Sequence, residues 1–87
     1  MKKVEVYYKD TCGYCRRAFE ILAGHNVERV KIDVDSDPKL WAECQERSGR
    51  NTVPQIFIGD HHVGGCDDLM ALEKRGELND YLEGKLP

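Results

Sequence analysis

The chain has 87 residues, with 16 acidic and 13 basic side chains and a formal net charge of −3. This length fits one small domain over residues 1–87, which is large enough to fold alone. Charges of both signs are interspersed, so the composition indicates neither a nucleic-acid-binding arm nor a membrane-binding patch. The first residues lack the apolar core of a signal peptide, and no stretch is apolar for long enough to span a membrane. We therefore expect a cytoplasmic protein.

The first part of the chain has the pattern of a strand, a helix and a second strand. Apolar, β-favouring residues predict a strand over 4–8, and good helix formers follow over 16–22 until Gly24 ends the helix. Alternating apolar and charged residues over 27–34 predict the second strand. Strand, helix and strand in this order form a βαβ unit, whose two strands are parallel.

The remaining residues predict a helix, a hairpin and two closing helical segments. Pro38 begins a helix that ends at Gly49. A strand over 52–58, with proline near its start, is followed by Gly59-Asp60, which predicts a tight antiparallel hairpin to residues 61–63. A third helix begins near residue 66 and is broken at Gly76, and a last amphipathic segment follows from Leu78 to Leu86.

Cys12 and Cys15 lie where the first strand ends and the first helix begins. The first helical turn has unpaired N–H groups and the positive end of the macrodipole, which favour a thiolate. Their spacing places both sulfurs on one helix face, close enough for a disulfide. We expect Cys12 to be the exposed attacking thiol and Cys15 the more covered resolving thiol. Asp10 or Thr11 is the expected cap of this helix.

A zinc site, or two core cysteines, is the alternative interpretation of this pair. A structural zinc site usually needs a second close pair of ligands. Cys44 and Cys66 are far apart, and His61 and His62 are adjacent rather than suitably spaced. A Cys-x-x-Cys pair beside a βαβ pattern therefore indicates a redox site before a zinc site.

Several other reactive or titratable residues have simpler interpretations. Cys44 shares a helix face with Leu40 and Trp41, so we expect a buried apolar thiol. The adjacent residues His61 and His62 near the hairpin tip are interpreted as solvated turn residues without a metal role. His25 falls in a loop and is assigned no function.

Gly64-Gly65 precedes the third helix, and backbone N–H groups left bare at such a position form a nest for a carboxylate. Asp67 is the expected cap of this helix, and that role is compatible with ligand binding nearby. Lys9, just before the cysteine pair, would either stabilise a thiolate or hold a carboxylate group of a ligand.

Three separated motifs together resemble the glutaredoxin family, of the short bacterial dithiol type: Cys-Gly-Tyr-Cys at 12–15, Thr-Val-Pro at 52–54 and Gly-Gly-Cys-Asp-Asp at 64–68. The resemblance extends from Val4 to about Leu82. It implies an α/β thioredoxin fold, with a four-stranded mixed sheet flanked by helices. In that fold a βαβ unit is followed by a β-hairpin and a C-terminal helix, and Pro54 is cis and faces the cysteines.

The resemblance implies a glutathione-dependent thiol–disulfide oxidoreductase that reduces protein disulfides and glutathione mixed disulfides. Cys12 would accept the glutathionyl group, and a second glutathione or Cys15 would then resolve the adduct. Glutathione would be the co-substrate, regenerated by glutathione reductase. The other partners would be glutathionylated or disulfide-containing proteins, with no nucleic acid and no membrane, and the protein would be a monomer.

The same resemblance implies a glutathione site beside the first cysteine. Lys9 and Tyr14 would flank the tripeptide, and the main chain of Val53 would pair with it. Residues 65–67 would hold its γ-glutamyl end through backbone amides. The full set implied by position is Lys9, Tyr14, Thr52, Val53, Pro54, Gly65, Cys66 and Asp67.

Two residues depart from the family pattern. Many members carry proline where this chain has Gly13, and a residue other than proline there accompanies, in some members, a glutathione-ligated 2Fe-2S cluster. A homodimeric cluster carrier using Cys12 is therefore the alternative function. Trp41 stands where relatives have arginine or glutamine, and its uncharged indole leaves it outside the binding set. A second alternative is a thioredoxin-like reductase that is reduced by a flavoprotein rather than by glutathione. Tyr14 and the nest at residues 64–68 argue against that alternative.

Overall fold

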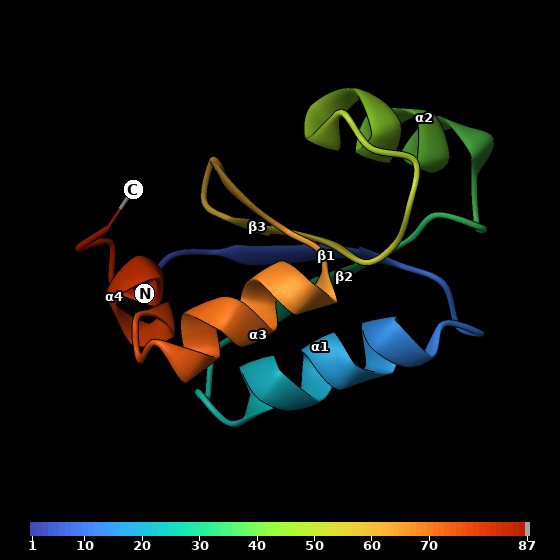
Figure 1. The fold of residues 1–87 in the computed structure, drawn as a ribbon. Coiled ribbons are helices and arrows are strands. Elements are labelled where there is room, and N and C mark those ends of the chain that lie inside the picture. Colours follow the sequence, from blue (N-terminus) through green and yellow to red (C-terminus); the bar gives the residue numbers. More distant parts are fainter. Residues whose placement is uncertain (87) are drawn as a thin grey trace.

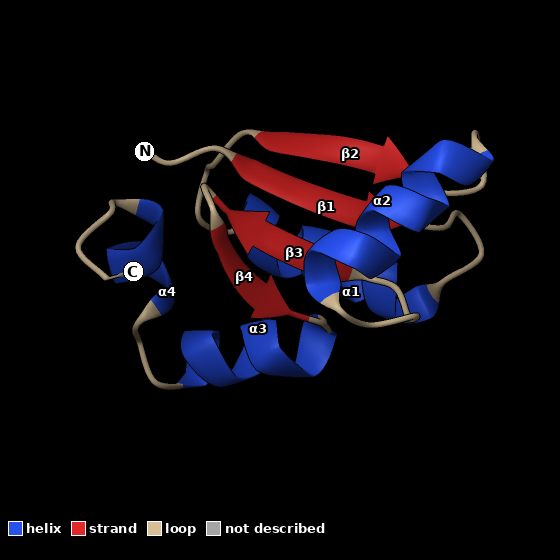
Figure 2. Ribbon diagram, turned by 90° about the horizontal axis from the view of Figure 1, so that it is seen from above, coloured by secondary structure: helices blue, strands red, loops and turns tan. Residues whose placement is uncertain are grey.

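The computed structural model describes residues 1–86, and it contains four strands and four helices. In chain order they are β1 (Val4–Tyr8), α1 (Gly13–Ala23), β2 (Arg29–Asp33), α2 (Pro38–Ser48), β3 (Gln55–Ile58), β4 (His61–Gly64), α3 (Cys66–Lys74) and α4 (Leu78–Leu82). The sheet order is β2-β1-β3-β4, with β1 parallel to β2 and both other pairs antiparallel (Figure 2). The predicted βαβ unit, hairpin and mixed four-stranded sheet are confirmed.

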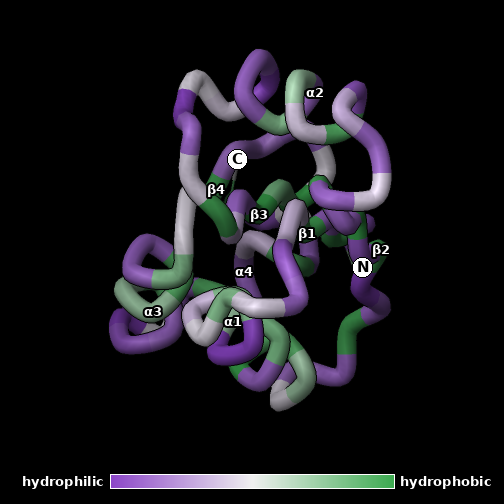
Figure 3. Tube along the Cα trace, turned by 90° about the vertical axis from the view of Figure 1, so that its right-hand side faces the viewer, coloured by the Kyte–Doolittle hydropathy of each residue, from purple (hydrophilic) through white to green (hydrophobic). Residues whose placement is uncertain are grey.

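Helices cover both faces of the sheet. Figure 1 shows α1 and α3 on one face, α2 on the other, and α4 at one end. None of the helices in residues 1–86 is both long and apolar enough to cross a membrane. Figure 3 shows that the outer turns of α2 are mostly hydrophilic, whereas green, hydrophobic segments lie along the strands.

The two faces of the sheet have separate clusters of buried side chains. The larger one, between the sheet and α1 and α3, includes Val4, Val6, Leu22, Ile56 and Leu69. The smaller one, beneath α2, is formed by Tyr7, Val34, Cys44 and Phe57. Every side chain of β3 is buried, because this strand lies between two others and is covered on both faces. Cys44 is fully buried, as the sequence predicts.

Local sequence signals set the ends of α2. The Asp37 carboxylate accepts a hydrogen bond from the Lys39 backbone N–H at 2.9 Å, and Pro38 occupies the first turn, where a missing N–H costs nothing. Gly49 ends the helix with φ at 69°, in the left-handed region that favours glycine. The helix bounds predicted from the sequence agree with these residues.

Two strands are shorter than the sequence predicts. β2 begins at Arg29 rather than Val27, and β3 begins at Gln55 rather than Thr52. The Val53–Pro54 peptide is cis, as the family resemblance implies. Because Pro54 also lacks an N–H, residues 52–54 form a loop at the start of β3 instead of extending its ladder.

The two adjacent histidines are not solvated turn residues, and that interpretation is wrong. Both belong to β4, where His61 pairs with Ile58 and His62 with Phe57. The His62 ring stacks on Phe57 at 4.8 Å, and the His61 ring stacks on Tyr81 at 4.9 Å. The turn itself is made by Gly59 and Asp60, with φ at 61° for the glycine.

His25 connects the loop after α1 to the two C-terminal helices. Its Nε2 lies 2.5 Å from the Glu73 carboxylate, and its Nδ1 lies 2.6 Å from the Asn79 side-chain oxygen. Both neighbours are acceptors, so a protonated ring donates to each. Burial alone would lower the pKa of His25, but the bonds to Glu73 and Asn79 outweigh it, and the pKa is raised from its ordinary 6.5.

We predict that this contact makes stability depend on pH. Because the pKa of His25 is higher in the folded state, its stabilising effect is complete below pH 6.5 and is lost as the pH rises through the raised value. Glu73 is 44% exposed, so the effect should be at most about 1 kcal/mol. Urea unfolding between about pH 5.5 and about pH 8.5 would measure it in wild type and His25→Gln. The other histidines are common to both proteins, and parallel pH profiles would contradict the prediction.

Candidate active site

Cys12 itself caps α1. Its backbone is extended, and its Sγ accepts a hydrogen bond from the Cys15 backbone N–H at 3.2 Å. The expectation that Asp10 or Thr11 caps this helix is therefore wrong, because the helix begins at Gly13 and the sulfur occupies the cap position. The first turn carries no acidic side chain. The backbone N–H groups and the helix dipole thus act on the Cys12 sulfur without a competing carboxylate in that turn.

The two cysteines of the pair differ in burial. Cys12 is half-buried, whereas Cys15 is only 1% exposed. Burial, followed by the hydrogen bond with Cys12, raises the pKa of Cys15 to about 12, against an opposing backbone hydrogen bond with Lys9. Cys15 is consequently a protonated thiol at neutral pH. The arrangement fits the predicted division between an accessible Cys12 and a covered Cys15.

The other two thiols are buried as well. Burial raises the pKa of Cys44 to about 11, and burial followed by the charge of Asp67 raises the pKa of Cys66. All four cysteines are free. Within residues 1–86 no three His, Cys, Asp or Glu side chains come together as a metal site would require. The zinc interpretation of the cysteine pair therefore has no ligand set in the described structure.

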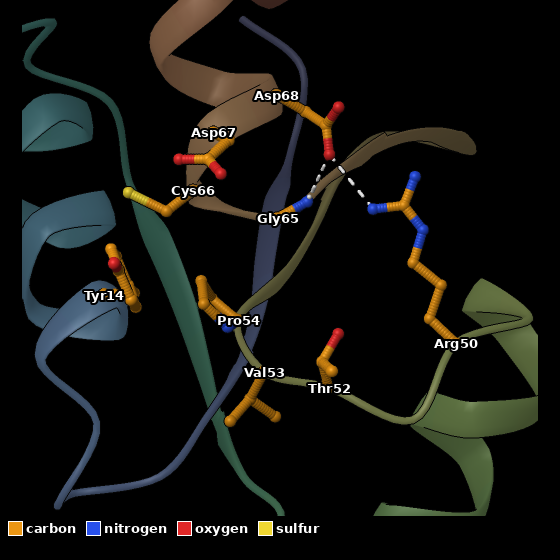
Figure 4. Close-up of a pocket in the computed structure, with 9 residues that line it drawn as sticks. All are labelled: Tyr14, Arg50, Thr52, Val53, Pro54, Gly65, Cys66, Asp67 and Asp68. Carbon is orange, nitrogen blue, oxygen red and sulfur yellow. Dashed lines mark hydrogen bonds and ion pairs between the residues drawn. The ribbon is translucent and has the colours of Figure 1, made fainter.

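A groove of about 280 Å³ opens beside the pair, between the start of α1, the loop before β3 and the start of α3 (Figure 4). We call it the main groove; its lining residues are Tyr14, Arg50, Thr52, Val53, Pro54, Gly65, Cys66, Asp67 and Asp68. The Cys12 Sγ donates to the Val53 carbonyl at 3.7 Å, which places the sulfur at the edge of this groove. The structure thus brings the three sequence motifs together around one space.

Sequence reasoning missed two residues of the main groove, Arg50 and Asp68. The Arg50 guanidinium donates to the Asp68 carboxylate at 3.0 Å, and the same carboxylate oxygen accepts from the Gly65 N–H at 2.9 Å (Figure 4). Asp68 could have been found from the sequence, because it lies three residues after Gly65, the position from which a side chain reaches back to the helix cap. Arg50 had no comparable local signal. The contact with Arg50 spans separate motifs and depends on the fold.

At the start of α3 the side chain that accepts the Gly65 backbone N–H belongs to Asp68 and not to Asp67. Gly65 is the cap residue, so Asp67 is already in the first helical turn, and its predicted capping role is wrong. Gly64 has φ at 118°, and a Cβ there would overlap the Asp68 carboxylate, so this turn requires glycine. The backbone hydrogen bond from Gly65, and then Arg50, lower the pKa of Asp68 despite partial burial. The Gly65 N–H is occupied by this carboxylate, whereas Cys66 and Asp67, in the first turn of α3, line the groove.

Lys9 is the one predicted binding residue outside the main groove. It lines a second, smaller depression of about 170 Å³, together with Cys12, Cys15 and Arg16. Its ammonium group lies 5.0 Å from the centre of the Trp41 ring, a cation–π distance. The Lys9 side chain is therefore directed to Trp41 on α2, while the residue itself lines the depression that contains both thiols.

Comparisons with known proteins agree with this geometry. The model of the glutaredoxin family matches residues 4–63. Glutaredoxin 3 of Escherichia coli K12 is 47% identical over 83 residues, which covers 95% of this chain and 100% of that protein. The solution structure of glutaredoxin from Brucella melitensis is 55% identical, with a TM-score of 0.87, covering 100% of this chain and 96% of that one. The protein in a crystal structure of a buckwheat glutaredoxin–glutathione complex is 30% identical, with a TM-score of 0.86, covering 95% of this chain and 78% of that one.

A four-stranded mixed sheet with flanking helices, and a cysteine pair at the start of α1, define a thiol–disulfide oxidoreductase of the thioredoxin fold. The family model and the 47% identity to a glutaredoxin over 95% of this chain then identify the family within this class. The protein belongs to the glutaredoxin family.

We predict that brief treatment with iodoacetamide at neutral pH modifies Cys12 alone. Cys15, Cys44 and Cys66 are buried, and burial raises the pKa of each, so little of their thiolate is present. Peptide mapping by mass spectrometry would identify the modified residue. The Cys12→Ser variant should show no rapid labelling; equally rapid labelling of Cys66 would contradict the assignment.

We also predict unequal effects of removing the two neighbouring carboxylates. Asp68→Ala should lower the free energy of unfolding by about 1 kcal/mol, because the Gly65 N–H loses its acceptor, whereas Asp67→Ala should change it little. The pKa of Asp68 is lowered by folding, so its contribution is complete above its ordinary pKa of 3.8 and disappears as the pH falls through the lower folded value. Urea unfolding at neutral pH measures both variants. Equal decreases in the free energy of unfolding of the two variants would contradict a specific stabilising effect of the Asp68–Gly65 hydrogen bond.

Proposed function

We propose that this glutaredoxin is a glutathione-dependent thiol–disulfide oxidoreductase, acting on glutathione mixed disulfides and on protein disulfides. The observation that carries the proposal is the position of the Cys12 sulfur. It is half-buried and 3.7 Å from the Val53 carbonyl, at the edge of the main groove. A ligand lying along Val53 would therefore have its sulfur next to the nucleophile.

Catalysis begins with Cys12 as thiolate. It attacks the glutathione sulfur of a mixed disulfide, the original S–S bond breaks, and the substrate thiolate leaves and takes a proton from water. A Cys12–glutathione disulfide remains in the main groove. The thiolate of a second glutathione then attacks the glutathione sulfur of this adduct, which releases oxidised glutathione and restores the Cys12 thiolate. The attacking thiol works best when its pKa is near the ambient pH.

Cys15 serves the second route, in which the substrate is a protein disulfide. After Cys12 has formed a mixed disulfide with the substrate, the Cys15 sulfur attacks the Cys12 sulfur, and its proton passes to the departing substrate sulfur. An intramolecular Cys12–Cys15 disulfide forms, and two glutathione molecules then reduce it and leave as oxidised glutathione. The glutathione route needs only Cys12, because a second glutathione supplies the thiolate that resolves the adduct.

The chemistry of glutathione matches the groups around the main groove. Its extended backbone would pair with the main chain of Val53, and its γ-glutamyl carboxylate would accept from the first-turn amides of α3. The Asp67 carboxylate would pair with its ammonium group. Lys9 is the cation assigned to the glycine carboxylate, because Arg50 is already paired with Asp68 at the α3 end of the groove.

The other groove residues would supply contact area and shape. The Tyr14 side chain is 69% exposed at the mouth, so it is free to lie against the tripeptide. Thr52, Pro54, Gly65 and Cys66 complete the walls, with Cys66 contributing its backbone. One neighbouring structure, of buckwheat glutaredoxin, is described as a complex with glutathione, which supports this ligand.

We predict that Cys12→Ser abolishes glutathione-driven reduction of a glutathionylated peptide, and that Cys15→Ser retains most of it. The serine hydroxyl is not ionised at neutral pH and cannot replace the thiolate, whereas Cys15 takes no part in the glutathione route. A coupled assay with glutathione reductase and NADPH measures the rate. Loss in both variants would favour a dithiol mechanism instead.

An inactive wild-type protein would contradict the proposed function and favour the cluster-carrier alternative. Anaerobic reconstitution with iron, sulfide and glutathione tests that alternative directly. A carrier would gain visible charge-transfer bands and become dimeric, and Cys12→Ser would abolish both. A colourless monomer would argue against it.

A further inference from the structure

Gln55 is the one polar residue buried in the core among the described residues, with 0% exposure. It is the first residue of β3 and directly follows the loop of residues 52–54. A buried amide group is costly unless its donors and acceptor are bonded. The partners of Gln55 therefore show what this residue does.

All of its side-chain bonds link the loop to β4. The Gln55 Nε2 donates to the Thr52 carbonyl at 3.1 Å and lies 3.2 Å from the Thr52 hydroxyl. Its Oε1 lies 2.7 Å from the His62 Nε2. Since the amide nitrogen faces Thr52, the oxygen must accept from His62, and this fixes the hydrogen of His62 on Nε2.

His62 is itself held in place. Its ring stacks on Phe57 with an interplanar angle of 27°, and its backbone pairs with the same residue across the hairpin. Burial, followed by the charge of Arg50, lowers the pKa of His62, which keeps the ring neutral at physiological pH. A neutral, stacked ring with its N–H aimed at Gln55 is a fixed donor.

The chain His62–Gln55–Thr52 ends at the main groove. Thr52 and Val53 line the groove, whereas Gln55 and His62 do not. The loop is outside the ladder of β3, so these side-chain bonds hold its carbonyl where no strand partner does. Any shift of the loop would move Val53 relative to the Cys12 sulfur, 3.7 Å away.

We propose that His62 and Gln55 are positioning residues, which hold the Thr52–Pro54 loop in the geometry that accepts the backbone of glutathione. This inference rests on the proposed function, since it assigns these residues to the same groove. They act through Thr52 and touch neither the ligand nor the reacting sulfurs. His62 performs this role through its Nε2–H group, which donates to the Gln55 side-chain oxygen.

The test compares two adjacent histidines on one strand. His62→Leu removes the donor, His62→Gln places an amide N–H at similar reach, and His61→Leu is the matched control, because His61 stacks on Tyr81 away from the groove. We expect His62→Leu to raise KM for a glutathionylated peptide about tenfold with kcat within about twofold of wild type. His62→Gln should recover most of the loss, and His61→Leu should resemble wild type.

A second readout needs no catalysis. Amide chemical shifts and hydrogen exchange of Thr52 and Val53, measured by NMR on the free reduced protein, should change in His62→Leu and stay unchanged in His61→Leu. If the wild type is inactive, the proposed function fails, but this measurement still tests the positioning. Unchanged Thr52 and Val53 amides in folded His62→Leu, or equal kinetic effects in both leucine variants, would overturn the inference.

Discussion

The central place of β1 in the sheet determines where the site forms. β1 is parallel to β2 and antiparallel to β3, so its carboxyl end lies beside the amino end of β3, with Tyr7 opposite Gln55. The chain leaves β1 into the cysteine pair and enters β3 through the Val53–Pro54 loop. One strand pairing thus brings Cys12 to 3.7 Å from Val53, although 41 positions separate them in the sequence. Burial of β1 on both faces stabilises this pairing.

The same helix start gives the two cysteines different chemistry. Cys12 lies at the end of α1, where its sulfur accepts a backbone N–H and contacts solvent. Cys15 is one turn further and faces the protein interior, where burial disfavours its thiolate. Identical side chains three residues apart therefore have different roles, because Cys12 lies at the helix start within reach of its N–H groups and Cys15 is buried beneath it.

Short-range signals in the sequence predicted much of the fold and part of the site. Asp37, Pro38 and Gly49 define α2 through local bonds and dihedral preferences, and the three motifs predicted most of the main groove. The failures arise where a contact depends on tertiary structure. Asp67 and Asp68 are equally good caps by type, and only the turn at Gly64 decides which carboxylate reaches Gly65. The histidine pair was assigned to the turn because the packing of their rings on Phe57 and Tyr81 cannot be inferred from the sequence pattern.

The loop of residues 52–54 explains why a polar side chain, that of Gln55, is buried in the core. Pro54 removes a backbone donor at the point where β3 would otherwise extend, so the ladder cannot hold residues 52–54. A side chain must do so from within the core, and an amide is suited to this because it donates and accepts at once. Burying Gln55 is unfavourable by itself, and its bonds to Thr52 and His62 offset that cost only when the loop and β4 are both in place. The core on the α2 side therefore couples the hairpin to the wall of the groove that faces Cys12.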